Sequence, residues 1–378
     1  MRAYIVAAVL VLLFGTALPA AKTLDVYVID ADGGKAMLVV TPSGQSMVVD
    51  AGYAGFINDK SQVVTPNDLD ADRIIRLVKL ANVKQIDYMV VTHYHNDHAE
   101  DVPKFVAKVG IPVRNFVDHG PPLEENPLTQ TIFKAYTDAI GKANRITVKP
   151  GDTLPLNGVQ VLVLTSAGAT IKTPLPGAGA PNPLCAAAAP APADNGENGA
   201  SIGLLYTFGK FRMLDLADLT KPKEYDLMCP DNRVGMVDLF MVSHHGFDLS
   251  NSPQLVYSLH PQVAIINNGA KKGNERQTAT VVRTSPGIVD SWQLHYSVDG
   301  SPENNAAPDA SGRAAIVRPR SLRSPISLQS DRLPKTQALG LDHIAFCSVG
   351  FGCRVVAQTR RATPAQTGQG TFRSRDYH

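Results

Sequence analysis

Short apolar runs separated by turn residues open the chain. The runs at 24–30, 36–40 and 46–49 are divided by polar and glycine-containing turns, which is the pattern of consecutive short strands. Further strands are predicted at 86–91, 113–117, 159–164, 202–207, 211–216, 237–242 and 263–267. The chain therefore begins with a β-meander.

Helical spacing follows the first strands. Residues 69–81 carry apolar side chains at Ile74, Ile75, Leu77 and Leu80, which lie on one helix face. Further helices are predicted at 101–109, 128–143, 253–259 and 277–282. Strands come first, then alternate with helices, and this theme repeats. The order favours layered sheets with helices outside.

The amino terminus has the pattern of an export signal. Arg2 precedes an apolar run at 4–14, and the small residues at 15–21 offer a cleavage site near 17–21. The run is shorter than the roughly 20 residues that span a bilayer, and an uncleaved anchor is the alternative interpretation. No later stretch is apolar enough to cross a membrane. We therefore expect a secreted or periplasmic mature protein.

Two segments lack regular periodicity. Residues 167–200 are rich in Ala, Pro, Gly and Asn, and a loop of this length is usually functional or mobile. Cys185 lies in this loop and Cys229 ends a short helical stretch, so the two could form a disulfide or stay separate. The segment 313–378 reads as a basic, disordered tail, which leaves 22–312 as the folded domain.

The charge is unevenly distributed. The whole chain has 36 Lys and Arg against 34 Asp and Glu, a net charge of +2. The tail holds 11 basic and 3 acidic residues, or +8, so residues 1–312 carry 25 against 31, or −6. The tail could be an arm for nucleic acid or an unstructured extension. We favour the extension because few aromatic residues are interleaved with the charges.

Three of the ten histidines lie within six residues. His93, His95 and His98 are accompanied by Asp97, and imidazole and carboxylate are natural ligands of Zn²⁺. At the end of a strand, His93 and His95 project to the same side and can bind one ion. Asp97 and His98 lie in the following turn and can reach a second ion. This cluster predicts a metal site.

The His-x-His-x-Asp-His pattern, between an apolar strand and a helix, resembles the first metal motif of the metallo-β-lactamase superfamily. The run at 48–52 is similar to the early strand whose Asp, here Asp50, supports the site from behind. The run at 213–218 is similar to the strand that ends in the bridging Asp, here Asp218. The resemblance covers most of 24–285 and implies an α/β fold, a four-layered αββα sandwich.

The late metal motif of that family is matched by His244-His245-Gly246. Either His could be the ligand, and His245 is favoured because family members usually place the ligand directly before Gly. The resemblance then implies two metal sites, with Zn²⁺ as the expected ion and Mn²⁺ as the alternative. The implied ligands are His93, His95 and Asp218 for the first metal, and Asp97, His98, Asp218 and His245 for the second.

The nearest subgroup by resemblance comprises soluble relatives of the metallo-hydrolase domain of ComEC-type competence proteins. The His-His-Gly ending and the Asn-x-x-Ser element at Asn198 and Ser201 carry this resemblance. Most of the superfamily has a His near the position of Asn198. An amide is a weaker, neutral ligand, which places permanent occupation of the first site in doubt.

The resemblance implies an exported hydrolase. Two cations roughly 3.5–4 Å apart can bridge a water and lower its pKa, and the resulting hydroxide attacks a phosphorus or carbonyl centre. Asp97 and Asp218 are the expected catalytic carboxylates, and Asp50 and Asp215 are candidates to orient imidazoles. The expected substrate is a small or cell-envelope phosphodiester. The net charge of the body disfavours tight binding of long nucleic acid.

Other interpretations stay open. A lactam or lactone could be the substrate, or the chain could bind metal or ligand without catalysis. His119 could line the pocket, although a structural role is favoured. Asn268, with Lys271 and Lys272 in a following basic turn, could hold a phosphate, although a solvated turn is favoured.

Overall fold

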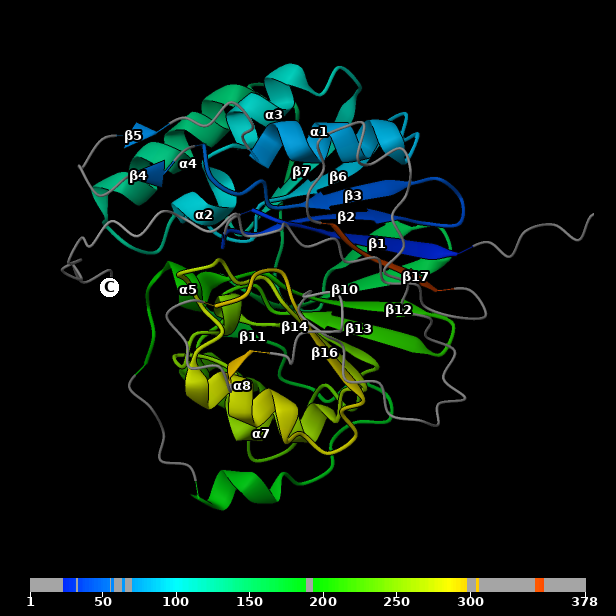
Figure 1. Cartoon of the computed structure of the whole chain (residues 1–378), viewed down its shortest axis with the longest axis vertical. Helices are drawn as coiled ribbons and strands as arrows, with labels where there is room; N and C mark the ends of the chain where they lie inside the picture. Colours follow the sequence, from blue (N-terminus) through cyan, green and yellow to red (C-terminus); the bar gives the residue numbers. More distant parts are fainter. Residues whose placement is uncertain are drawn as a thin grey trace, which may run out of the picture.

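The computed structural model describes residues 23–31, 33–54, 70–187, 193–297 and 304–305, and the backbone of 56–57, 63–64 and 344–349. Two β-sheets lie face to face, with helices α1, α3 and α4 above one sheet and α7 and α8 below the other (Figure 1). The predicted α/β class and αββα layering are confirmed. The predicted signal peptide and most of the tail lie outside the described residues.

The first sheet combines an antiparallel half with a parallel half. Its strands, in spatial order, are β17 (Ile344–Val349), β1 (Leu24–Ile29), β2 (Ala36–Val40), β3 (Ser46–Val49), β6 (Ile86–Val90), β7 (Val113–Asp118) and β8 (Asn144–Thr147). Pairing is antiparallel from β17 to β3 and parallel from β3 to β8. β17 comes from the segment predicted as tail and pairs along the whole of β1.

The second sheet repeats this arrangement. Its strands are β11 (Ala169–Thr170), β10 (Val159–Ser166), β12 (Gly203–Phe208), β13 (Phe211–Asp215), β14 (Leu239–Val242), β15 (Val263–Ile266) and β16 (Asp290–Gln293), with β9 (Thr153–Leu156) also on β10. Strands β13 to β16 are parallel. A separate hairpin joins β4 (Phe56–Ile57) and β5 (Val63–Val64). Because parallel strands end at the same edge, loops that are distant in sequence meet there.

The helices cover the outer faces and the edge where the parallel strands end. Those of the first half are α1 (Asp70–Leu80), α2 (Asn96–Ala99), α3 (Val102–Lys108) and α4 (Pro127–Ile140). Those of the second half are η1 (Pro183–Ala187), α5 (Glu197–Ala200), α6 (Lys221–Met228), η2 (His244–Gly246), α7 (Pro253–Leu259) and α8 (Arg276–Arg283). None of the described helices has the length and apolar character that a membrane crossing requires.

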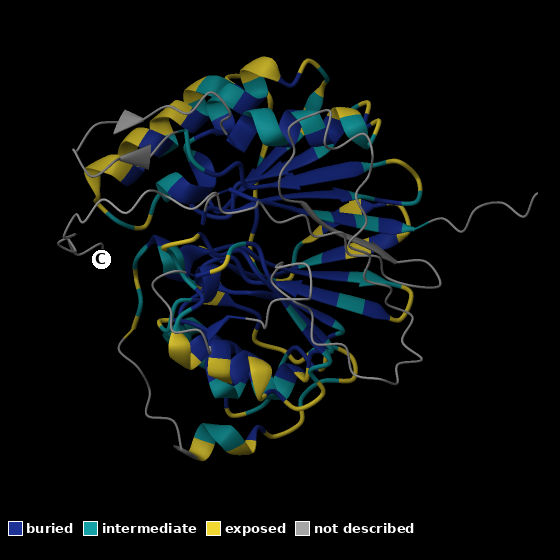
Figure 2. Cartoon of the chain, viewed as in Figure 1, coloured by how far each residue is buried: buried dark blue, intermediate teal, exposed yellow. Residues whose placement is uncertain are grey.

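Alternation along the strands builds the core. In β1, Leu24, Val26 and Val28 face the second sheet, where Tyr206 of β12 and Met213 of β13 meet them. The intervening positions pack under the outer helices, so most strand residues are buried (Figure 2). Burial on both faces explains the near-continuous apolar runs in the parallel strands.

Every strand and helix predicted from the sequence is present, with ends displaced by a few residues at most. Strands β8, β9 and β16 were not predicted: β8 is polar and largely exposed, and Pro155 interrupts the apolar pattern of β9. The prediction of an unstructured loop at 167–200 is wrong in part, since β11, η1 and α5 lie within it. A disulfide joins Cys185 of that segment to Cys229 at the end of α6.

Candidate metal centre

The predicted metal ligands meet at the edge where the parallel strands end. His93 to His98 follow β6 of the first sheet, whereas Asp218 follows β13 and His245 follows β14 of the second. Helices α2 and α5 lie at this edge, between the two layers in Figure 1. The fold therefore brings the segment at 93–98 together with two segments that lie more than 100 residues further along the chain.

Four buried side chains form the centre of this cluster. Asp97, His98, Asp218 and His245 each direct one ligand atom inward, and the four atoms lie within 4.8 Å of one another. The Nε2 atom of His245 lies 2.9 Å from Asp97 Oδ2 and 3.2 Å from Asp218 Oδ2. The Nε2 atom of His98 is 3.2 Å from Asp218 Oδ2. Two imidazoles and two carboxylates at such spacing fit one divalent cation.

A second group of ligand atoms adjoins the first at Asp218. His93 Nε2 is 3.2 Å from His95 Nδ1 and 4.0 Å from Asp218 Oδ2. His244 Nε2 is 3.7 Å from the same Asp218 oxygen. The Asn198 Oδ1 atom is buried and has no hydrogen-bond partner among the described residues. An orphaned amide oxygen is costly unless something binds it, so it fits a ligand or metal role.

The outer nitrogen of each imidazole has a partner. His98 Nδ1 lies 2.9 Å from Asp50 Oδ2, and His245 Nδ1 lies 3.1 Å from the Asn267 carbonyl oxygen. His93 Nδ1 faces the Thr92 hydroxyl at 3.2 Å, and His95 Nε2 faces Glu124 Oε1 at 3.5 Å. These contacts leave Nε2 of His93, His98 and His245, and Nδ1 of His95, directed inward. Outer contacts of this kind fix the tautomer and orientation of ligating imidazoles.

Asp50 contacts the cluster from the end of β3 in the first sheet. Its carboxylate accepts hydrogen bonds from the Thr92 amide at 2.8 Å and the Thr92 hydroxyl at 2.7 Å, besides its contact with His98. The backbone of Asp50, His244 and His245 has positive φ angles of 59°, 53° and 54°. Non-glycine residues in this region cost free energy and cluster at functional sites, where the surrounding structure holds them.

Electrostatics keep both carboxyl groups ionised. Burial alone would raise their pKa, but the cations and imidazoles around Asp97 and Asp218 hold both pKa values well below the usual range; Lys272 has the largest such effect on Asp97. Burial lowers the pKa of His98, yet the neighbouring carboxylates outweigh it and raise that pKa to about 10. Burial lowers the pKa of His244 to about 4, so this imidazole is neutral at pH 7. His98 is therefore protonated at pH 7 in the absence of a metal, and a cation bound at its Nε2 atom would displace that proton.

Two lysines that pattern analysis did not assign to the site lie beside it. Lys272 donates hydrogen bonds to Asp97 Oδ2 and, at 2.9 Å, to the Tyr53 hydroxyl. The favoured interpretation of its turn as solvated is wrong for Lys272, although Lys271 is exposed. Lys35 is buried and pairs with Asp215, so Asp215 joins the two sheets rather than contacting an imidazole.

The other predicted site residues lie outside the cluster. His119 is buried, its Nε2 is 3.1 Å from Glu197 Oε2, and its ring packs 4.7 Å from that of Tyr94. Asn268 donates hydrogen bonds to the carbonyl oxygens of Gly269 and His295. Glu197 and Glu124 were missed because they belong to no sequence pattern, although Glu197 directly precedes Asn198.

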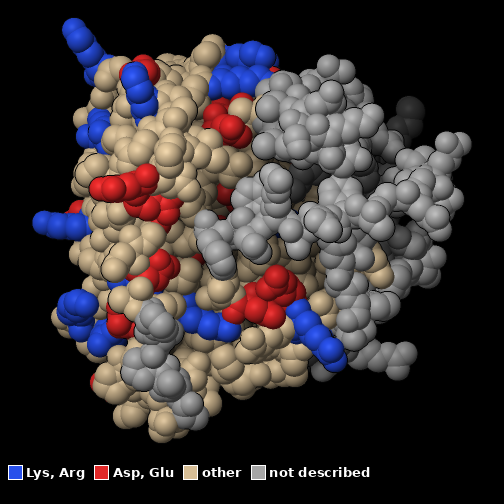
Figure 3. Space-filling view, turned by 90° about the vertical axis from the view of Figure 1, so that its left-hand side faces the viewer, with Lys and Arg blue, Asp and Glu red and all other residues tan. Residues whose placement is uncertain are grey.

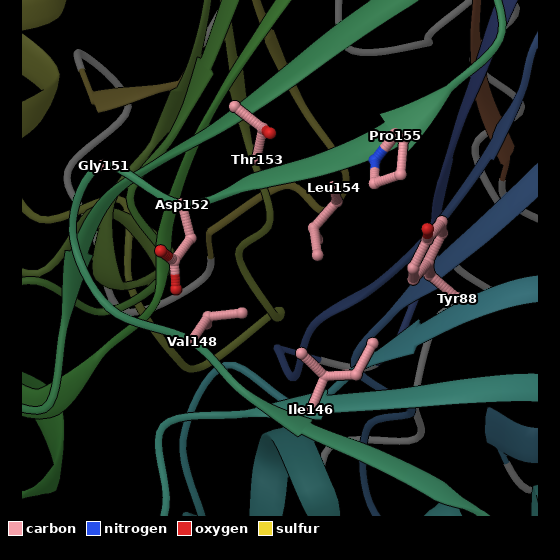
Figure 4. Close-up of a pocket in the computed structure, with 8 residues that line it drawn as sticks. All are labelled: Tyr88, Ile146, Val148, Gly151, Asp152, Thr153, Leu154 and Pro155. Carbon is pink, nitrogen blue, oxygen red and sulfur yellow. The ribbon is translucent and has the colours of Figure 1, made fainter.

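A cavity of about 430 Å³ opens elsewhere, between the two sheets (Figure 4). Its lining comes from β6, β8, β9 and the loop before β9, and consists of Tyr88, Ile146, Val148, Gly151, Asp152, Thr153, Leu154 and Pro155. None of the predicted metal ligands lines this cavity.

The family model of the metallo-beta-lactamase superfamily matches residues 29–180, which include the His93–His98 motif. A hydroxyacylglutathione hydrolase of Idiomarina loihiensis is 31% identical over 114 residues, which are 30% of this chain and 37% of that protein. The chain thus matches little more than a third of the length of this relative.

Two solved structures are similar at low sequence identity. The metallo-beta-lactamase fold protein YhfI from Bacillus subtilis is 12% identical, with a TM-score of 0.45, covering 73% of this chain and 97% of that one. The diiron beta-hydroxylase CmlA from Streptomyces venezuelae is 14% identical, with a TM-score of 0.40, covering 73% and 53% of the two chains.

Proposed function

We propose that the chain is a metal-dependent hydrolase of the metallo-beta-lactamase superfamily, whose family model matches residues 29–180, and that its site is the cluster around Asp218. The observation that carries this proposal is the convergence of Asp97, His98, Asp218 and His245 within 4.8 Å. These four residues are buried, come from both sheets, and have donor atoms suited to a borderline divalent cation.

We propose two ions, Zn²⁺ or Mn²⁺. One would be held by the four central residues, and the other by His93, His95 and Asp218 with the Asn198 amide oxygen. When bound, a pair of divalent cations activates a water for attack and stabilises the charge that develops on the substrate. The amide is the weaker donor. We therefore expect the site of His93, His95, Asp218 and Asn198 to lose its ion first when the metal concentration falls.

The chain's own residues prepare this chemistry. Asp50 and Glu124 hold the outer nitrogens of His98 and His95, so the inward nitrogen of each ring is the one directed at a cation. The Asp218 carboxylate stays ionised and lies near imidazoles of both ligand groups, so it can serve both. The neutral His244 faces the same oxygen and is placed to contact a substrate at the centre.

For the substrate we propose a phosphodiester, either a small molecule or a cell-envelope substituent. The resemblance of the His-His-Gly and Asn-x-x-Ser elements to ComEC-type domains motivates this class. Basic side chains lie in small separate groups on the described surface of the face in Figure 3, and the 1–312 body carries −6, so long nucleic acid is not favoured. We also propose that residues 1–21 direct export to the periplasm or exterior.

A panel of substrates tests the reaction class. Zinc-loaded and manganese-loaded protein is offered bis-p-nitrophenyl phosphate, nitrocefin, a homoserine lactone and a hydroxyacylglutathione. We expect turnover of the phosphodiester above the others. Hydrolysis of the lactam, lactone or thioester alone would replace the proposed substrate class.

A second candidate rests on Asn198, whose neutral amide stands where the family resemblance places a His. A protein that binds metal or ligand without catalysis would tolerate this change. Well under one equivalent of metal, together with no turnover on any substrate after metal addition, would favour that candidate over a hydrolase.

A further inference from the structure

Lys272 reaches the metal centre from the turn that follows β15. Its ammonium contacts Asp97 Oδ2 and the Tyr53 hydroxyl, and lies 5.3 Å from the centre of the Tyr53 ring. The Lys272 side chain is 26% exposed, whereas the Asp97 side chain is 7% exposed. Lys272 is therefore the more exposed partner of this ion pair.

The backbone holds Lys272 in this position. The amide of Gly269 donates a 2.9 Å hydrogen bond to the Lys272 carbonyl oxygen, and the amide of Asn274 donates one of the same length to the His245 carbonyl oxygen. A Cβ atom at Gly273, where φ is +74°, would lie 2.0 Å from that His245 oxygen. The turn that carries Lys272 is thus packed directly onto a metal ligand.

Gly33 of the first half also packs closely against this turn. A Cβ atom at Gly33, where φ is +92°, would lie 3.0 Å from the Gly269 amide nitrogen and 3.2 Å from Lys272 Cβ. Tyr53 follows β3 of the first sheet, and Lys272 follows β15 of the second. The Lys272–Tyr53 pair is therefore fixed by both halves of the molecule, unlike a surface lysine with free rotamers.

The charge at this position favours an anion. An ammonium has three N–H donors, and the described residues accept from two of them, through Asp97 and Tyr53. A cation bound to Asp97 draws on the same carboxylate, which leaves the charge of Lys272 less compensated. A partly buried cation beside divalent metal is stabilised when an anionic oxygen binds it.

We propose that Lys272 and Tyr53 form an anion-binding subsite beside Asp97, which holds a non-bridging phosphoryl oxygen of the substrate. This inference rests on the proposed function and narrows it to substrates that carry a negative charge next to the reacting centre. Lys272 donates to the anionic oxygen, and Tyr53 keeps the ammonium directed at it.

Phosphate binding tests the subsite without turnover. Inorganic phosphate is titrated calorimetrically into the zinc-loaded full chain, for the wild type, Lys272→Met and Lys271→Met. Methionine keeps the apolar stem and removes the charge, and Lys271 is the exposed neighbour on the same turn. We expect at least about tenfold weaker phosphate binding in Lys272→Met, because a charge-assisted hydrogen bond is lost, and wild-type affinity in Lys271→Met.

Zinc content and two substrates complete the test. We expect equal zinc in all three proteins. In Lys272→Met, kcat/KM for bis-p-nitrophenyl phosphate should fall by roughly 10²-fold, as when one preorganised donor is removed, and by more than kcat/KM for the neutral p-nitrophenyl acetate. If Lys272→Met binds phosphate as tightly as the wild type, the subsite is overturned. The same holds if the variant loses zinc but its zinc-loaded molecules keep the wild-type phosphate affinity.

The two proposals fail separately. If the wild type binds phosphate through Lys272 but hydrolyses no phosphodiester, the subsite stands and the proposed function falls. If it hydrolyses the phosphodiester and Lys272→Met binds phosphate as tightly as the wild type, the function stands and the subsite falls.

Discussion

At the scale of single residues, Asp218 has more contacts within the centre than any other carboxylate described. Its Oδ2 atom lies within 4.0 Å of Nε2 atoms from His93, His98, His244 and His245. One oxygen surrounded by imidazoles of both ligand groups is the position that a bridging ligand requires.

Asp218→Ala should therefore remove both metal sites together. We expect less than one equivalent of zinc and a loss of turnover of at least about 10³-fold, because groups that act as a unit fail together. Metal analysis and kcat/KM measure this, and circular dichroism checks that the fold is kept. Retained activity would contradict the bridging role.

His119→Ala is the matched control, because it removes a buried imidazole that lies outside the cluster. It leaves Glu197 without one of its partners, although the amides of Tyr94 and Leu123 still donate to that carboxylate. We expect a loss of about 1–3 kcal/mol in the free energy of unfolding. Zinc content and turnover should stay at the wild-type level.

The metal ligands that lie in one short sequence pattern were predictable, whereas the side chains that contact them from distant parts of the chain were not. The His93–His98 cluster lies within six residues, so its chemistry is visible in the sequence. Glu124 and Lys272 reach the same centre from loops that no periodicity singles out. Only the folded chain shows that a lysine of a basic turn is directed at Asp97.

At the scale of elements, α1 and α3 are joined through Asp101. This residue precedes α3, is fully buried, and accepts a 2.7 Å hydrogen bond from the Ala71 amide in α1 through Oδ2. Its other oxygen has no partner among the described residues. Burial raises the pKa of Asp101 to about 6, against the smaller opposing effect of that hydrogen bond.

The sign of this shift predicts a pH-dependent stability. A carboxyl whose folded pKa exceeds its unfolded value stabilises the fold fully only below the unfolded pKa of about 4, and loses that contribution as pH rises through 6. Asp101→Asn keeps an acceptor and removes the charge. We expect a higher melting temperature than the wild type at pH 7.5, with the difference shrinking toward pH 4. An equal difference at both pH values would contradict the prediction.

Elements with strong periodicity were predictable from sequence, and elements at sheet edges were not. α1 presents Ile74, Ile75 and Leu77 on one face, and the structure buries that face. β8 was not predicted because its exposed residues, among them Asn144 and Arg145, give no apolar alternation. It is a strand because it pairs with β7. Its register depends on contacts that a local window does not contain.

At the scale of the whole molecule, the metal centre links the two sheets. His93, His95, Asp97 and His98 follow a strand of the first sheet, whereas Asp218 and His245 follow strands of the second. The alternation of strands and helices predicted the layers, but not the edge at which these six side chains meet. That these side chains converge was expected only from the resemblance to the metallo-β-lactamase superfamily.

Chelation should therefore lower the stability of the entire fold. A ligand present at 100 times its Kd stabilises the folded state by about 2.7 kcal/mol, so EDTA should reduce the melting temperature by several degrees. Thermal unfolding with and without EDTA measures this. Asp218→Ala should show no such shift, and an equal shift in that variant would mean that the chelator acts elsewhere.

The division of ligands between the sheets has a consequence for how the site comes into being. Neither half of the sandwich contains all the ligands of a metal site. The centre therefore cannot form before the two halves pack together. A nascent chain that has emerged only as far as β8 would present imidazoles and one carboxylate but could not retain an ion firmly. Metal capture would then mark the last step of maturation, and its timing would report when the two layers close on each other.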